Sequence, residues 1–167
     1  GFSAEDSFVV SDAARERFAG NAKRGAAQQA VWDQMMARYQ RKYPELAAQW
    51  DLYVKGELPV KLEEILPAFS PEKPLATRVA SGQVLSAIAP RINTLVGGSA
   101  DLTPSNNTLP KDGVGVRRGD FSGSYIYFGV REHGMGAIMN GLALHGLRPY
   151  GGTFLIFSDY MRPSIRL

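Results

Sequence analysis

One carboxylate, Glu132, stands in a glycine-rich turn between an apolar, β-favouring run and a run with helical spacing. The upstream run covers residues 126–128, and downstream apolar residues recur at helical intervals from Met135 to Leu142. Ligands commonly meet the sheet of an α/β protein where a strand gives way to a helix. A carboxyl group held there among apolar neighbours has a raised proton affinity and can donate a proton. The competing interpretation is structural, because the helix dipole stabilises an acidic residue in a first helical turn.

A second turn with chemical potential spans residues 97–106, Gly-Gly-Ser-Ala-Asp-Leu-Thr-Pro-Ser-Asn. Its glycines let backbone N–H groups approach a ligand, and Asp101 and Ser105 add a carboxylate and a hydroxyl. The turn matches neither a Walker A loop nor Gly-x-Gly-x-x-Gly. The pattern alone leaves open an ordinary turn in which Asp101 or Ser105 caps a helix.

Three aromatic residues, Phe154, Phe157 and Tyr160, recur at every third position after a Gly-Gly pair. By spacing alone, such a row favours a packed core over a ligand pocket. The two histidines, His133 and His145, are too isolated in the sequence to predict a metal site, so no metal ligand is assigned in this chain.

The segments that must position these residues change character at a proline-rich stretch, residues 56–74, which we interpret as a surface linker. The sequence before the linker predicts helices over 13–23 with Ser11-Asp12 as N-cap, over 26–43 after a break at Gly25, and over 45–50 after Pro44. The sequence after it predicts a helix over 76–89, a strand over 94–96, a long loop over 103–122, a strand over 125–128, a helix from 132, a strand over 149–153 and a final helix from about 158. This alternation predicts an α/β fold with a parallel sheet. We divide the chain into a helical connector, residues 1–70, and a sheet-containing part, residues 71–167.

Composition narrows the class of protein further. The 167 residues carry a net charge of only +3, with no run of like charge of the kind that binds nucleic acid. Cysteine is absent, which excludes disulfides and cysteine-ligated metals and fits a reducing compartment. No stretch is apolar enough for a membrane helix, and no signal peptide is evident at the start. We expect a cytoplasmic protein without nucleic-acid or membrane partners, and we interpret both ends as cuts within a longer chain.

Three segments together resemble the transketolase family, in its order and at its usual separations. They are residues 97–106, residues 127–141 with Arg-Glu-His-Gly-Met-Gly-Ala-Ile-Met-Asn-Gly, and residues 150–167 with Thr-Phe-Leu-Ile-Phe-Ser-Asp-Tyr. The last segment is most similar to bacterial members. The resemblance implies that residues from about 71 onward form the first part of a pyrimidine-binding (Pyr) domain that binds thiamine diphosphate. It also implies that residues 1–70 connect this domain to a preceding diphosphate-binding (PP) domain.

The resemblance implies roles for individual residues. Glu132 matches the glutamate that hydrogen-bonds N1′ of the cofactor's aminopyrimidine ring. Phe154, Phe157 and Tyr160 match the aromatic pocket around that ring, with Phe157 the candidate for direct contact, and Asp101 matches an aspartate near the cofactor. Arg78 and Ser105 match positions that bind the sugar phosphate, and a forked, permanently charged guanidinium suits that task.

The implied activity is transfer of a two-carbon ketol unit between sugar phosphates in the pentose phosphate pathway. The implied assembly is a homodimer whose active sites are shared between subunits, with Mg²⁺ or Ca²⁺ held by the PP domain. On this interpretation the 167-residue piece alone is inactive. Two alternatives stay open: a related thiamine enzyme such as dihydroxyacetone synthase, and a catalytically silent subunit that acts by docking to a partner. A third thiamine enzyme, deoxyxylulose-phosphate synthase, fits less well. The sequence Arg131-Glu132-His133 and the segment 97–101 argue against it.

Overall fold

The computed structural model describes residues 3–5 and 7–167, and the chain divides into two compact units. The first unit ends at Ala48, and the second runs from Gln49 to Leu167. The boundary lies within a helix.

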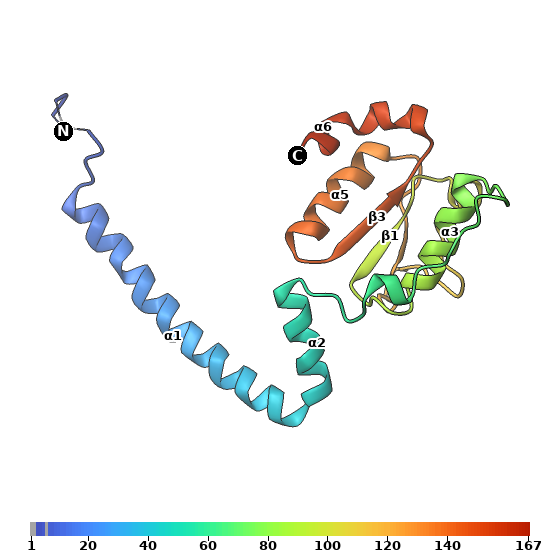
Figure 1. Ribbon diagram of the computed structural model, residues 1–167. Helices are drawn as coiled ribbons and strands as arrows, with labels where there is room; N and C mark the ends of the chain where they lie inside the picture. The colour runs from blue at the N-terminus through green and yellow to red at the C-terminus, as the bar shows by residue number, and fades with distance from the viewer. Residues whose placement is uncertain (1–2, 6) are drawn as a thin grey trace. The chain divides into compact units, whose positions relative to one another are not determined.

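The first unit consists mainly of one long helix, α1, Asp12–Lys42 (Figure 1). Ser11 is its N-cap, as predicted, because its side chain accepts a hydrogen bond of 3.3 Å from the Ala14 N–H. The predicted break at Gly25 is wrong. A single glycine costs a helix only about 1 kcal/mol, and the strong helix formers around it carry the helix through. Although α1 has 31 residues, neither it nor any other helix in the described part of the chain could cross a membrane.

Helix α2, Pro44–Lys55, begins at a proline, which suits the first helical position because it has no N–H to leave unpaired. It runs five residues beyond the predicted end at residue 50. Contacts within the second unit account for the extension. The Tyr53 hydroxyl donates to the His145 carbonyl, and the Asn93 side chain donates to Gln49 at 3.1 Å. Sequence periodicity does not report such long-range contacts.

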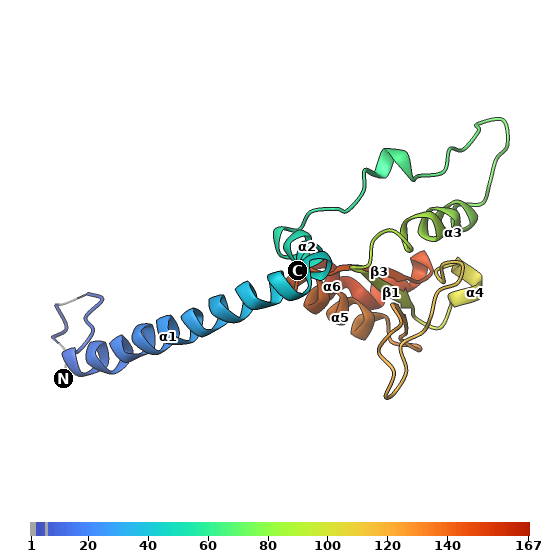
Figure 2. The same ribbon diagram turned by 90° about the horizontal axis from the view of Figure 1, so that it is seen from below.

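The second unit is built around three parallel strands: β1, Leu95–Ser99; β2, Tyr125–Tyr127; and β3, Arg148–Gly152. Strand β1 lies in the middle, in the order β2-β1-β3. Helix α3, Thr77–Ile88, lies on one side of this sheet, and α5, Glu132–Leu144, on the other (Figures 1 and 2). The predicted α/β class with a parallel sheet is therefore confirmed, and the predicted helices near 76–89 and from 132 match α3 and α5.

Shorter helices occupy segments that the sequence left irregular. A turn of 3₁₀ helix, η1, covers Leu62–Glu64 within the linker, and a short helix, α4, covers Thr103–Asn106 within the predicted loop 103–122. The predicted final helix from about residue 158 is wrong in its start. The chain instead forms a 3₁₀ helix, η2, over Leu155–Met161 and then α6, Arg162–Arg166.

Two glycines predicted to form a turn lie within the central strand instead. A Cβ added to Gly97 would lie 2.0 Å from the Tyr150 carbonyl oxygen, and one added to Gly98 would lie 1.7 Å from that of Ile126. Both distances are far below van der Waals contact, so only glycine allows the neighbouring strands to pair here at this separation.

The core between the sheet and α5 is small and apolar. Ala100, Phe128 and Met135 are buried together, and three partly buried residues pack against them: Ile126, Met139 and Met161. Tyr125 is completely buried at the start of β2, and its polar tip is hydrogen-bonded, as described below.

Candidate functional site

An open hollow of about 680 Å³ lies where β3 ends. Residues from α3, α4, the end of β3 and the start of η2 line it: Ala76, Thr77, Arg78, Ser81, Leu85, Ser105, Asn106, Thr108, Tyr150, Gly151, Gly152, Thr153, Phe154 and Leu155. The carboxyl ends of strands in an open parallel sheet are where ligands usually bind. The hollow brings together Arg78, Ser105 and Phe154, which are distant in the sequence.

Glu132 is the first residue of α5, and only 7% of it is exposed. The Thr153 hydroxyl donates to its Oε1 at 3.4 Å, and Thr153 itself lines the hollow. No Lys, Arg or His nitrogen lies within ion-pair distance of Glu132 among residues 3–5 and 7–167. A carboxyl group so placed sits at the positive end of a helix with a neutral hydroxyl as its partner, beside the hollow.

The three aromatic residues stack along η2. The Phe154 and Phe157 rings lie 6.1 Å apart at 19°, and the Phe157 and Tyr160 rings lie 6.1 Å apart at 21°. In a 3₁₀ helix, side chains at i and i+3 eclipse one another, so a three-residue spacing becomes a stack. Phe154 and Tyr160 are exposed and Phe157 is half-buried, so the core packing favoured by spacing alone does not describe this row.

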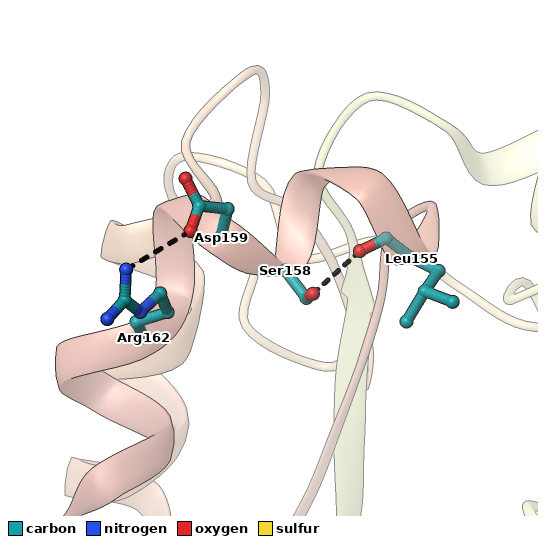
Figure 3. A network of polar contacts seen from close by, with 4 residues as sticks. All are labelled: Leu155, Ser158, Asp159 and Arg162. Atoms are coloured by element: carbon teal, nitrogen blue, oxygen red, sulfur yellow. Dashed lines mark hydrogen bonds and ion pairs between the residues drawn. The ribbon is translucent and has the colours of Figure 1, made fainter.

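One polar contact lies within η2 and another joins it to α6 (Figure 3). The Ser158 hydroxyl donates to the Leu155 carbonyl at 2.6 Å, and an Arg162 nitrogen lies 3.5 Å from an Asp159 carboxylate oxygen. The Ser158 bond satisfies a carbonyl within η2. The exposed ion pair contributes little energy, about 0.2–1 kcal/mol for pairs of this kind.

The residues predicted to bind phosphate and cofactor differ in their surroundings. Arg78, in the first turn of α3, is exposed, and Ser105 in α4 is half-buried. Asp101 is exposed, does not line the hollow and adopts a left-handed backbone with φ of 61°. Aspartate tolerates this conformation better than most residues, and non-glycine residues held in it often cluster at functional turns.

A continuous chain of hydrogen bonds includes two residues that line the hollow, Asn106 and Thr108. Thr108 donates to the Asn106 Oδ1 at 2.8 Å, so its only proton is used. It must therefore accept from the Tyr125 hydroxyl, 2.8 Å away, and Tyr125 in turn accepts from Thr103, 2.7 Å away. The Asn106 Nδ2 donates to the Ser99 hydroxyl at 3.0 Å. The proton directions are thus fixed along the whole chain.

This chain of bonds ties α4 to the sheet. The Ser99 hydroxyl donates a hydrogen bond to the Gly152 carbonyl at 3.0 Å, and this bond links the ends of β1 and β3. The same hydroxyl accepts a hydrogen bond from the Leu102 N–H at 3.2 Å. No buried side-chain nitrogen or oxygen in the described part of the chain lacks a hydrogen-bond partner. A fully satisfied buried network of this kind rigidifies its surroundings.

Tyr150 in β3 is one of the residues that line the hollow. Its hydroxyl donates to the Thr108 carbonyl at 3.0 Å. Burial, with a smaller effect of the nearby Tyr125, raises the pKa of Tyr150 above its usual range. The group therefore stays a neutral donor throughout the physiological pH range.

Sequence reasoning missed the supporting residues around the predicted site. Thr153, Thr108, Tyr125 and Tyr150 received no role, because an isolated threonine or tyrosine carries no periodic signal. Their common feature is position: three of them lie within or just after a parallel strand. A search of residues within and just after the parallel strands could have found Tyr125, Tyr150 and Thr153.

Comparison with known proteins gives two family matches. Residues 73–167 match the sequence model described as the transketolase pyrimidine-binding domain, and residues 1–59 match that of the transketolase thiamine diphosphate binding domain. The first match covers the sheet, the hollow and every predicted site residue.

Individual proteins similar to this chain are also transketolases. The chain is 48% identical to a transketolase of Halalkalibacterium halodurans, over 87% of this chain and 22% of that protein. It is 46% identical to the transketolase of Bacillus subtilis, over 98% of this chain and 25% of that protein. A crystal structure of transketolase from Pichia stipitis in complex with sedoheptulose 7-phosphate superposes with a TM-score of 0.89 at 41% identity, covering 99% of this chain and 26% of that one. This chain therefore spans about a quarter of the length of these relatives.

Proposed function

The chain belongs to the transketolase family, and from this premise we propose that the protein containing it transfers a two-carbon ketol unit from a ketose phosphate to an aldose phosphate. The observation that carries the proposal is Glu132: a buried carboxyl group at a helix start, with a neutral threonine hydroxyl as partner, beside a hollow at the end of a parallel strand. A structural acid in a first helical turn is ordinarily exposed, so the dipole alone does not explain this burial.

The residues around Glu132 fit a flat heteroaromatic cofactor. In the stack, Phe154 and Tyr160 are exposed and Phe157 is half-buried, and an aminopyrimidine can stack on aromatic rings of this kind. Bound thiamine diphosphate supplies the electron sink for cleaving the carbon–carbon bond beside the ketose carbonyl. With the cofactor bound, Glu132 would hold a hydrogen bond at N1′ of the pyrimidine, and the Thr153 hydroxyl, which donates to Glu132 Oε1, would orient the carboxyl group.

Substrate binding is assigned to Arg78 and Ser105, which line the hollow. Arg78 offers a forked charged donor and Ser105 a hydroxyl, and both line the same hollow from different helices. The related Pichia stipitis protein is described in complex with a ketose phosphate, which supports a sugar phosphate as the ligand class.

The metal and the diphosphate are assigned outside these residues. Within residues 3–5 and 7–167, no three His, Cys, Asp or Glu side chains gather as a metal site, so no step is assigned to Mg²⁺ or Ca²⁺ here. We further propose that two copies share each active site. The 167-residue chain alone is then expected to be inactive, because it spans only about a quarter of its relatives.

The test compares two carboxyl-to-amide variants of the full-length protein that carries this sequence, supplied with thiamine diphosphate and Mg²⁺. Glu132→Gln keeps the shape but removes the acid, and it should lower kcat for ketol transfer from sedoheptulose 7-phosphate at least about a hundredfold. Glu63→Gln, at an exposed site in η1, is the matched control and should leave kcat unchanged. A Glu132→Gln enzyme within threefold of the wild-type kcat would remove the proposed role. An unmodified protein without ketol transfer would favour a docking subunit.

A further inference from the structure

Helices α3 and α4 meet at a residue without a side chain. A Cβ added to Gly82 would lie 2.9 Å from the Asn107 Cβ and 3.1 Å from the Asn107 carbonyl oxygen. Carbon atoms pack at about 3.5–4.0 Å, so an alanine at this position would overlap by about 0.6 Å or more. Asn107 follows α4 directly and has a left-handed backbone, with φ of 53°. The separation of the two helices therefore depends on glycine.

The two helices also carry the proposed phosphate-binding pair. Arg78 lies one turn before Gly82 in α3, and Ser105 lies two residues before Asn107. A displacement of Gly82 relative to Asn107 would therefore also displace Arg78 and Ser105, each within about one turn of the contact.

Helix α4 is held in place by hydrogen bonds, so it cannot easily move away from Gly82. Thr103 and Asn106 in α4 belong to the hydrogen-bond chain that runs through Tyr125 and Ser99 to the sheet. On the α3 side, Leu85 is buried three residues after Gly82 and fixes the middle of the helix. The first turn of α3, with Arg78, is exposed and has no side-chain N-cap. An overlap at Gly82 would therefore tilt the start of α3 and move Arg78 away from α4.

We propose that Gly82 is a positioning residue whose missing side chain lets α3 approach Asn107 closely enough to hold Arg78 and Ser105 at the separation that a sugar phosphate requires. The inference rests on the proposed function, since it gives that phosphate pair its geometry. Gly82 itself contacts no substrate. Its effect is on selectivity for the phosphate group, and the residues assigned to the cofactor keep their positions.

The experiment measures kcat/KM in the full-length protein for sedoheptulose 7-phosphate and for unphosphorylated sedoheptulose. The ratio of the two values reports the phosphate site alone. Gly82→Ala should lower this ratio about tenfold, through a higher KM for the phosphorylated sugar with little change in kcat, because a displacement of this size weakens oriented hydrogen bonds. Gln83→Ala, at the next and exposed position of α3, is the control and should leave the ratio unchanged.

A double variant tests the contact itself. Asn107→Gly removes the overlapping Cβ and suits the left-handed backbone. In Gly82→Ala/Asn107→Gly only the 3.1 Å contact with the carbonyl oxygen remains, so the loss of phosphate selectivity should shrink from about tenfold to about threefold. If Gly82→Ala does not fold, the double variant is compared with Asn107→Gly alone. A ratio about threefold lower in the double variant supports the inference, and equal ratios overturn it.

Arg78→Ala separates this inference from the proposed function. If Arg78→Ala lowers the ratio about a hundredfold and Gly82→Ala leaves it unchanged, the inference fails and the phosphate site stands. If Arg78→Ala leaves the ratio unchanged, the phosphate site fails and the inference fails with it. Equal losses of kcat/KM for both sugars in Gly82→Ala would also overturn the inference, because they would show general damage to the fold.

Discussion

Replacing Tyr125 by phenylalanine removes one oxygen atom from the middle of the hydrogen-bond chain and leaves the buried ring in place. The Tyr125 hydroxyl is the only link in that chain between Thr103, the first residue of α4, and Thr108, two residues after its end. Its loss should therefore loosen α4 from the sheet without opening a large cavity.

The expected magnitude follows from the two bonds that are lost. Each neutral hydrogen bond contributes about 1 kcal/mol net, so the local stability of α4 should fall by about 2 kcal/mol. Thr108 keeps its bond to Asn106, and Thr103 is half-buried, so neither hydroxyl becomes a fully buried orphan that would raise the figure much further. At about 1.4 kcal/mol per factor of ten, 2 kcal/mol corresponds to about a thirtyfold change in an opening equilibrium.

Native-state hydrogen exchange is the suitable assay, because global unfolding of a long multidomain chain need not be two-state. The Ser105 and Asn106 amides both donate to the Leu102 carbonyl, at 2.8 and 3.0 Å, and they report the opening of α4. In the full-length Tyr125→Phe protein these amides should exchange about thirtyfold faster. Tyr127→Phe, at a side chain that is 61% exposed, should change them less than twofold. Less than a threefold change in Tyr125→Phe would refute the reasoning that this hydroxyl ties α4 to the sheet.

Two further changes test other parts of the fold. Gly98→Ala puts a Cβ 1.7 Å from the Ile126 carbonyl oxygen and should abolish soluble expression, whereas Gly25→Ala, with open space around its Cβ in α1, should leave soluble yield unchanged. Normal yield of Gly98→Ala would contradict the close approach of β1 and β2. Hydrogen bonds from the Ser122 side chain, and then its backbone, lower the pKa of Asp120, so Asp120 favours the fold above its ordinary pKa and this contribution is lost as the pH falls through the lowered value. In Ser122→Ala the pKa of Asp120 should rise toward its ordinary value, as followed by carboxyl-carbon NMR; an unchanged pKa would count against the side-chain bond.

Elements with strong local signals could be predicted from the sequence. Helix α3 shows apolar periodicity and ends before Pro90, and α5 begins at Glu132 where a glycine-rich turn meets a periodic run. The parallel sheet followed from the alternation of such segments. In each case the residues that decide the structure lie close together in the chain.

Elements decided by distant neighbours were misread. Gly97 and Gly98 have turn-forming chemistry, yet they pair as a strand because Tyr150 and Ile126 approach from either side. Gly25 is a local exception: the helix formers around it outweigh one glycine, and nothing distant in the described part of the chain contacts it. The aromatic row from Phe154 to Tyr160 has a spacing of three, which suits a 3₁₀ helix, whereas the spacing alone favoured a packed core.

The candidate site divides in the same way. Glu132, Arg78 and Ser105 were chosen on sequence and resemblance, and the structure places the last two on one hollow, with Glu132 bonded to a residue that lines it. The supporting chain through Tyr125 joins residues from Ser99 to Gly152, and its members are ordinary threonines, serines and asparagines. Only the fold brings these residues together, so their role could not be read from the sequence.

The central position of β1 has a consequence for synthesis on the ribosome. Ser99, at the end of β1, pairs with Gly152 of β3, which is made 53 residues later. At about 5–20 residues per second, translation of that interval takes roughly 3–10 seconds. Throughout that interval one edge of β1 lacks its native neighbour, and the glycines that permit close pairing also leave its backbone unshielded. A nascent chain paused between β2 and β3 should therefore be the species most prone to capture by chaperones or to aberrant strand pairing.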